Sequence, residues 1–211
     1  MARLFALMLV LPIDQNKKIK KVFAIILAVF INVNISYSKN TNEAYFAGGC
    51  FWCMEDSFEK VKGVEEVISG YSGGELKNPT YKEVTYGNTG HFEVAKIIYD
   101  ENIINYKELL NLYWQNIDPF DSAGQFCDKG LSYRSVAFYK NENEKKEIEI
   151  SIKNIEKRFK GKKVVTFIRK FKKFYPAEDY HQNYYQENFV NYLLYKKACG
   201  REKTLEKIWK N

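Results

Sequence analysis

The sequence predicts a single α+β domain, in which helices pack on a largely antiparallel sheet. The chain has 211 residues, a length at which one domain buries a substantial core without extra crosslinks. Its 45% hydrophobic and 28% charged residues are ordinary for a globular protein. Strand-like and helix-like segments follow one another with no internal repeat and no linker that would mark a second domain, and this order favours the α+β class.

The first half of the domain contains the segments with the clearest periodicity. Apolar residues at near-helical spacing predict a helix over 50–63, and a second helix is expected over 105–117, where apolar side chains share one face. The stretch 75–90 is rich in proline and glycine and is expected to be a loop. Strands are expected over 42–49, 64–74 and 91–100.

The second half continues in the same way. A loop over 120–133 leads into an expected strand at 134–139, and an exposed amphipathic helix is expected over 141–159. Another strand is expected over 162–171. The tail after residue 175 mixes loop with one or two helices.

Residues 1–38 carry the pattern of a secretory signal peptide. A basic cluster at 17–21 precedes an apolar run at 22–31, and Ser38 is a small residue at the expected cleavage point. Residues 1–15 fit this pattern poorly, so we expect translation to start nearer the basic cluster. An uncleaved anchor is the alternative, although the apolar run is short for a bilayer span. We therefore predict an exported, periplasmic or extracytoplasmic protein, with a cytoplasmic one as the alternative.

Removing this segment changes the charge of the protein. The whole chain carries +7, whereas residues 39–211 hold 28 basic and 25 acidic side chains, a net charge of +3. Basic residues gather at 157–174, but acidic residues follow at once, which favours a solvated face over a nucleic-acid groove. We expect no nucleic-acid partner and a monomeric protein.

The cysteines are Cys50, Cys53, Cys127 and Cys199, all within the exported part. An even count is compatible with two structural disulfides in an oxidising compartment, although a chain of this size does not require them. Cys50 follows a glycine pair at an expected helix start, where free N–H groups and the helix dipole favour a thiolate. This placement predicts a reactive nucleophile, with a small buried hydrophobe as the alternative.

The Cys50-x-x-Cys53 spacing is compatible with three chemistries. It occurs in dithiol–disulfide redox pairs, in half of a zinc site, and around a single reactive thiol. Zinc is disfavoured because the chain has no second Cys-x-x-Cys, and His91 and His181 lie far apart in the sequence. We expect no metal and no cofactor.

Five sequence blocks carry a resemblance that covers roughly residues 44–200. In this order they resemble the peptide-methionine sulfoxide reductase A family: GCFWCMEDSFEKVKGVEEVISGYSGG, NPTYKEVTYGNTGHFEV, QFCDKGLSYRSVAFY, AEDYHQNYY and ACGRE. The resemblance implies a two-layer α/β sandwich. It also implies reduction of the S epimer of methionine sulfoxide, free or within oxidised proteins, to methionine.

The resemblance assigns roles by motif position. They are the nucleophile Cys50, a methyl pocket of Phe51 and Trp52, sulfoxide-oxygen donors Tyr81 and Tyr133, the proton donor Glu93, and Asp128, which helps to hold the site. The alternative interpretation of Phe51 and Trp52 is that they are core residues. The alternative for Glu93 is that it is a charged residue on the surface of a strand. A sulfoxide oxygen leaves only when protonated, so Glu93 needs a pKa raised by an apolar, partly buried site.

The thiol that resolves the Cys50 sulfenic acid is open at this point. The resemblance favours Cys199 of the ACGRE block, with Cys53 and Cys127 as alternatives. Residues 201–211 look helical, whereas many members of the family carry a longer glycine-rich tail. The expected reductant is thioredoxin, or an extracytoplasmic thioredoxin-like protein, and His181 matches the family pattern without an assignable role.

Two other functions remain as alternatives. One is a thiol–disulfide oxidoreductase that uses Cys50 and Cys53 directly, although no proline is convincingly placed for a thioredoxin-type site. The other is a non-catalytic, disulfide-stabilised binding domain.

Overall fold

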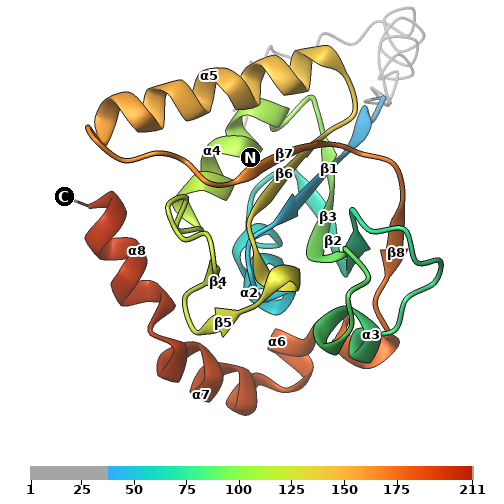
Figure 1. The fold of residues 1–211 in the computed structure, drawn as a ribbon. Coiled ribbons are helices and arrows are strands. Elements are labelled where there is room, and N and C mark those ends of the chain that lie inside the picture. The colour runs from blue at the N-terminus through green and yellow to red at the C-terminus, as the bar shows by residue number, and fades with distance from the viewer. Residues whose placement is uncertain (1–37, 211) are drawn as a thin grey trace, which may run out of the picture. The chain divides into compact units, whose positions relative to one another are not determined.

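The computed structural model describes residues 38–210, which form a six-stranded sheet with helices packed on it (Figure 1). The sheet order is β7-β6-β1-β3-β2-β8, and β6 and β7 are its parallel pair, while the other neighbours are antiparallel. The strands are β1 (Thr41–Ala47), β2 (Val64–Ser72), β3 (Phe92–Asp100), β6 (Val136–Tyr139), β7 (Phe167–Lys170) and β8 (Phe174–Pro176). The predicted α+β class is therefore confirmed.

The remaining elements are helices and one short hairpin. The helices are α2 (Phe51–Phe58), α3 (Tyr81–Tyr86), α4 (Tyr106–Gln115), α5 (Glu142–Arg158), α6 (Tyr184–Glu187), α7 (Phe189–Cys199) and α8 (Arg201–Trp209). The described residues also contain two 3₁₀ turns, η1 (Leu131–Tyr133) and η2 (Asp179–His181). A short hairpin is formed by β4 (Gly124–Gln125) and β5 (Asp128–Lys129). The predicted signal peptide lies outside them, apart from Ser38.

Helix α3 corrects the prediction of a loop over 75–90. The Thr80 hydroxyl accepts a hydrogen bond from the Glu83 backbone N–H, and the Glu83 carboxylate accepts one from the Thr80 N–H. This reciprocal capping box starts a helix in which Val84 is buried, so apolar periodicity does not reveal it. The consequence is functional, because α3 begins at Tyr81.

The strand expected over 162–171 is shorter than predicted. Its first residues are used elsewhere: the Val165 N–H donates to the Pro119 carbonyl at 2.9 Å, and the Thr166 hydroxyl contacts that of Ser135. Pairing with β6 starts at Phe167, opposite Val136. Regular strand structure is therefore confined to β7.

The main core lies between the sheet and helices α2 and α4. Phe46 of β1 stacks on Tyr113 of α4 with ring centroids 4.6 Å apart, and Met54 and Phe58 of α2 are fully buried beside them. The Tyr113 hydroxyl donates to the Ala47 carbonyl at 2.9 Å, which anchors the end of β1. This packing fixes the β1–α2 connection, where the glycine pair and Cys50 lie.

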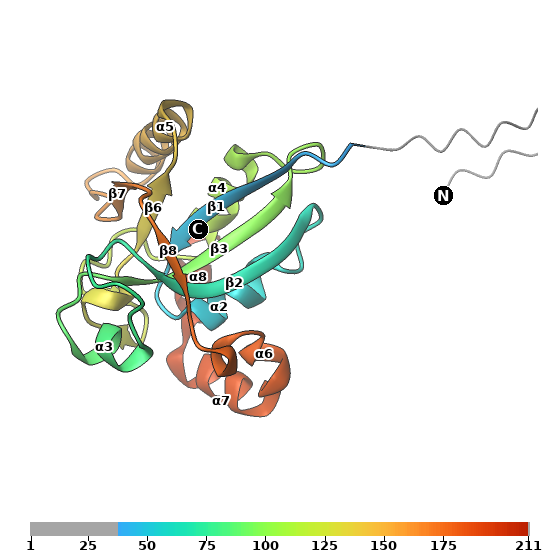
Figure 2. The ribbon, with the colours of Figure 1, turned by 90° about the vertical axis from the view of Figure 1, so that its right-hand side faces the viewer.

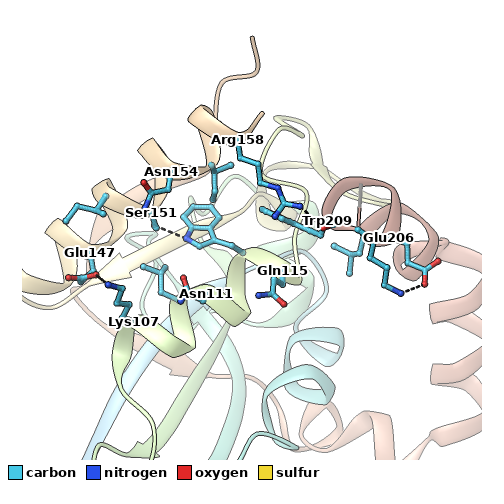
Figure 3. Close-up of a pocket in the computed structure, with 15 residues that line it drawn as sticks. Lys107, Asn111, Gln115, Glu147, Ser151, Asn154, Arg158, Glu206 and Trp209 are labelled. Atoms are coloured by element: carbon cyan, nitrogen blue, oxygen red, sulfur yellow. Dashed lines mark hydrogen bonds and ion pairs between the residues drawn. The ribbon is translucent and has the colours of Figure 1, made fainter. Parts of the chain in front are cut away.

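The C-terminal end of helix α8 packs away from that connection, against α4 and α5. A cavity of about 660 Å³ lies between α4, α5 and α8, and Arg158 and Trp209 lie next to each other in its lining (Figure 3). The Trp209 indole donates to the Ile117 carbonyl at 3.1 Å, so α8 is tied to the loop after α4. None of the residues that line this cavity is a predicted site residue. Among the described residues, no helix is long and apolar enough to cross a membrane.

Candidate active site

Two glycines allow α2 to begin where it does. Gly49 has φ +82°, and a Cβ there would lie 2.6 Å from the Cβ of Gln125. A Cβ on Gly48 would lie 2.5 Å from the Met54 sulfur. The chain turns tightly between β1 and α2, and Cys50 becomes the residue that precedes the first helical turn.

Cys50 opens onto a small pocket of about 70 Å³ at the end of the sheet. Helix α2, α3, β3, the β5–η1 segment and α7 each contribute side chains to it. The lining residues are Cys50, Phe51, Trp52, Tyr81, Glu93, Asp128, Tyr133 and Tyr195. The structure thus brings together all of the predicted site residues except the candidate resolving cysteines, and it adds Tyr195.

Glu93 is 2% exposed on β3, and its carboxylate accepts a hydrogen bond from the Phe51 N–H at 3.1 Å. Burial raises the pKa of this carboxyl to about 8, and the negative charge of Asp128 adds to the shift. Glu93 is therefore protonated at neutral pH, as a proton donor in the site must be.

Two tyrosine hydroxyls face each other across the pocket. Those of Tyr81 and Tyr133 lie 3.4 Å apart, although α3 and η1 are distant in sequence. Burial raises the pKa of Tyr81 to about 12 and that of Tyr133 further. Both remain protonated, so each can donate a hydrogen bond to an oxygen placed between them and Glu93.

The aromatic pair after Cys50 forms the apolar side of the pocket. Phe51 is fully buried, and the half-buried Trp52 stacks on Tyr184 with ring centroids 3.8 Å apart. The ring of His181 lies 5.1 Å from that of Phe51 and 4.5 Å from that of Tyr81. The two rings present apolar surface to the pocket beside the thiol, a setting that suits a methyl group.

Tyr195 of α7 is the pocket residue that sequence reasoning missed. Its hydroxyl donates to the Asp128 carboxylate at 2.6 Å, and the Cys50 backbone also hydrogen-bonds this carboxylate. Burial raises the pKa of Asp128 nevertheless. The signal that could have found Tyr195 is its position one helical turn before Cys199.

Comparisons with known proteins agree on one family. The family model for peptide methionine sulfoxide reductase matches residues 42–211. The chain is 48% identical over 170 residues to peptide methionine sulfoxide reductase MsrA of Limosilactobacillus reuteri, covering 80% of this chain and 97% of that protein. The chain belongs to the peptide methionine sulfoxide reductase family.

Further relatives and solved structures of the family agree in sequence and fold. MsrA of Listeria monocytogenes is 48% identical over 174 residues, covering 82% of this chain and 98% of that protein. Reduced Mxr1 of Saccharomyces cerevisiae superposes with a TM-score of 0.66 at 31% identity, covering 71% of this chain and 86% of that one. Methionine sulfoxide reductase A of Corynebacterium diphtheriae superposes with a TM-score of 0.65 at 28% identity, covering 72% of this chain and 76% of that one.

The cysteines of this family member form one disulfide and one dithiol. Cys127 is bonded to Cys199, while Cys50 and Cys53 are free and only 5% and 3% exposed. Sequence reasoning weighed Cys199 and Cys127 as separate partners for Cys50, and the structure pairs them with each other. In this redox state Cys53 is the free thiol next to Cys50.

The helix start favours a thiolate at Cys50, but its buried position in this state opposes one. Burial raises its pKa well above that of an exposed thiol, and the neighbouring Cys53 and Glu93 add to the shift. These effects outweigh the helix N-terminus. The hydrogen bond from Cys50 and the charge of Arg201 instead lower the pKa of Cys53 to about 7.

Arg201 is a second residue that sequence reasoning missed. It follows the Cys199-Gly200 pair, and its buried guanidinium donates to the carbonyls of Gly48 (3.2 Å) and Asn116 (2.5 Å). It therefore holds the backbone in front of Cys50 and places a positive charge near Cys53. The ACGRE block thus supplies an arginine to the backbone in front of Cys50 in addition to the cysteine that is bonded to Cys127.

Two other features bear on ligands. Both ring nitrogens of His181 are buried without a hydrogen-bond partner, and burial lowers its pKa. Cys127, Asp128 and Cys199 have ligand atoms within 4.8 Å of one another. Both sulfurs there are held in the disulfide, so they offer no thiolate to a cation.

Proposed function

We propose that the protein reduces the S epimer of methionine sulfoxide, free or within oxidised proteins, to methionine. The pocket carries this proposal: it joins a thiol, an apolar aromatic wall, a protonated carboxyl and two tyrosine hydroxyls within about 70 Å³. The aromatic wall fits the substrate methyl group, and the three O–H donors fit the sulfoxide oxygen. Membership of the family supports the same reaction.

In the first step, the Cys50 sulfur attacks the sulfoxide sulfur while Glu93 donates its proton to the oxygen. The Cys50 thiol loses its proton in the same step, and the newly formed Glu93 carboxylate can accept it. The hydroxyl oxygen then passes to the Cys50 sulfur, and both the substrate S–O bond and the transient bond between the two sulfurs break, which gives methionine and a Cys50 sulfenic acid. Atoms and charge balance without an external acid, which suits a buried site.

In the second step, we propose that Cys53 resolves the sulfenic acid. The lowered pKa of Cys53 means that its thiolate form is populated near neutral pH. The residue also lies beside Cys50, on the first turn of α2. Attack gives a Cys50–Cys53 disulfide and water. Cys199, which the family resemblance favours, is held by Cys127 in this structure, and it can act only after that bond is reduced.

A dithiol reductant must then regenerate the two thiols. We propose thioredoxin, or a thioredoxin-like protein outside the cytoplasm. We also propose that residues 1–38 direct export and that cleavage follows Ser38; a mature protein whose N-terminus lies far from Lys39 would contradict this. We also propose that the protein is a monomer, and light scattering should give the mass of one chain.

The S-epimer assignment is tested with the two purified epimers of N-acetylmethionine sulfoxide and excess dithiothreitol. We expect time-dependent formation of N-acetylmethionine from the S epimer, with at least about 100-fold lower kcat/KM for the R epimer. The physical reason is that the R epimer, bound in the same pocket, has its methyl group and oxygen in exchanged positions. Its oxygen would lie against Phe51 and Trp52, and the O–H donors would be unpaired. Equal rates would reject the assignment.

The same assay separates the competing function. A thiol–disulfide oxidoreductase would reduce a disulfide such as that of insulin with dithiothreitol but leave both sulfoxide epimers unchanged.

A further inference from the structure

A second concave feature lies at the same end of the sheet as the active-site pocket. Two cavities of about 560 Å³ and 200 Å³ share Gly73, Gly74, Glu75 and Arg169, and together they form one groove. Its charged lining residues are Lys77, Arg134, Arg169, Lys170, Lys172 and Lys173 against the single acid Glu75. We call this feature the basic groove.

The charge of the basic groove is unusual for this protein. Its six cations and one acid give it +5, whereas residues 39–211 as a whole carry +3. The rest of those residues are therefore slightly acidic. Positive charge concentrated in a concave surface attracts and orients anionic partners.

The two arginines are fixed in place without a carboxylate. The Arg134 guanidinium lies 4.6 Å from the centroid of the Phe167 ring, and that of Arg169 lies 5.2 Å from the same ring. Arg169 also donates to the Gly73 carbonyl at 3.3 Å. Among the described residues, neither arginine forms a salt bridge. Planar guanidiniums held in this way are suited to bind carboxylates.

The lysines of the basic groove are also available to a partner. Lys172 forms an ion pair with Glu75 at 3.3 Å, but the two side chains are 79% and 89% exposed, so water and salt screen the pair. The Lys173 ammonium lies 4.6 Å from the Tyr175 ring centroid, and its side chain is exposed.

The basic groove adjoins the active-site pocket through two elements. In η1, Leu131 lines the groove and Tyr133 lines the pocket. At the start of β3, Phe92 lines the groove and Glu93 lines the pocket. Successive side chains of a strand point to opposite faces, so the groove and the pocket lie on opposite faces of the sheet and approach each other at this end. A polypeptide whose methionine sulfoxide occupies the pocket reaches the groove if its neighbouring residues pass around this end of the sheet.

We propose that the basic groove binds acidic side chains that flank methionine sulfoxide in oxidised proteins, and so selects acidic segments as substrates. This rests on the proposed function and deepens it. An extended chain advances about 3.3 Å per residue, so side chains a few positions from the sulfoxide reach different cations along the groove. Free methionine sulfoxide has no such side chains and does not use it.

The test uses three peptides of equal length with a central methionine S-sulfoxide, flanked on both sides by glutamate, serine or lysine. Dithiothreitol is the reductant, so no reductant protein has to dock. We expect kcat/KM at low salt to be about 10-fold or more higher for the glutamate peptide than for the lysine peptide. In 0.5 M salt the screening length falls to about half its physiological value, so the preference should largely collapse.

The variant K172E/K173E should bring the ratio of the two peptides close to one. Both lysines are exposed, so the fold should tolerate the change. The control K146E/K153E makes the same charge change on exposed positions of α5 and should keep the wild-type ratio. Turnover of N-acetylmethionine sulfoxide should be unchanged in both variants.

Three results would overturn the inference. In the first, the wild-type enzyme shows no preference among the peptides. In the second, the α5 control loses the preference as much as K172E/K173E does. In the third, K172E/K173E has an effect only when thioredoxin replaces dithiothreitol. The last would make the groove a reductant-docking surface. Failure of the proposed function is distinguishable, because N-acetylmethionine S-sulfoxide would then not be reduced at all.

Discussion

Cys50→Ser is expected to lower the turnover of methionine sulfoxide by about 1,000-fold or more, because a serine hydroxyl cannot form the sulfenic acid intermediate. Cys53→Ser should behave differently. Its first turnover should remain close to wild type, since Cys50 and Glu93 are intact, while later turnovers should slow because the sulfenic acid lacks its neighbouring thiol. Rapid-quench measurement of methionine formed per enzyme separates the two steps.

The disulfide Cys127–Cys199 supplies the control for this pair. Both sulfurs are already bonded in the structure, so Cys127→Ser and Cys199→Ser should retain multiple turnovers. After one turnover without reductant, mass spectrometry should find a new Cys50–Cys53 link. A Cys50–Cys199 link, together with loss of later turnovers in Cys199→Ser, would instead establish the resolving cysteine favoured by the family resemblance.

Glu93→Gln is expected to lower kcat by about 100-fold or more, since the amide cannot give the sulfoxide oxygen a proton. The amide keeps the shape of the side chain and still accepts from the Phe51 N–H, so the pocket should stay intact. A thermal unfolding scan is the control for folding. Turnover like that of the wild type would remove Glu93 as the acid.

The pH profile gives a second readout of the same group. Burial raises the pKa of Glu93 to about 8, so the proton donor is present below that pH and is lost as the pH rises through it. Wild-type turnover should therefore fall above about pH 8. The residual turnover of Glu93→Gln should lack this fall, measured with dithiothreitol in excess at every pH.

Stability should follow the same titration with a defined sign. The folded-state pKa of Glu93 lies above its ordinary value of 4.5, so the unfolded chain loses this proton first. Its contribution to stability is complete below about pH 4.5 and declines as the pH rises towards 8. Glu93→Gln should remove that part of the pH dependence.

Much of the fold could be predicted from local patterns. The helices around α2, α4 and α5 and the strands β1, β2, β3 and β6 follow from periodicity, because each buries one face against the main core. Helix α3 could not, since a polar capping box starts it and Val84 is its buried residue. Strand β7 is shortened by contacts with Pro119 and Ser135, which lie far away in the sequence.

The candidate site divides in the same way. Cys50, Phe51 and Trp52 are adjacent in one motif. The family resemblance identifies the further site residues, which are Tyr81, Glu93, Asp128 and Tyr133. Tyr195 and Arg201 were missed because their partners, Asp128 and Gly48, lie far away in the sequence. No local sequence pattern indicates such contacts.

By itself, the sequence determined most of the element order, the helix start at Cys50 and the family motifs, because these depend on neighbouring residues. Only the tertiary structure decided the protonation states and the cysteine pairing. Burial of Cys50 raises its pKa despite the helix N-terminus, and burial of Glu93 keeps its proton in place. The end of α7 brings Cys199 to Cys127 and leaves Cys53 as the free thiol beside the nucleophile. Desolvation and chain-distant contacts arise only when the elements pack together.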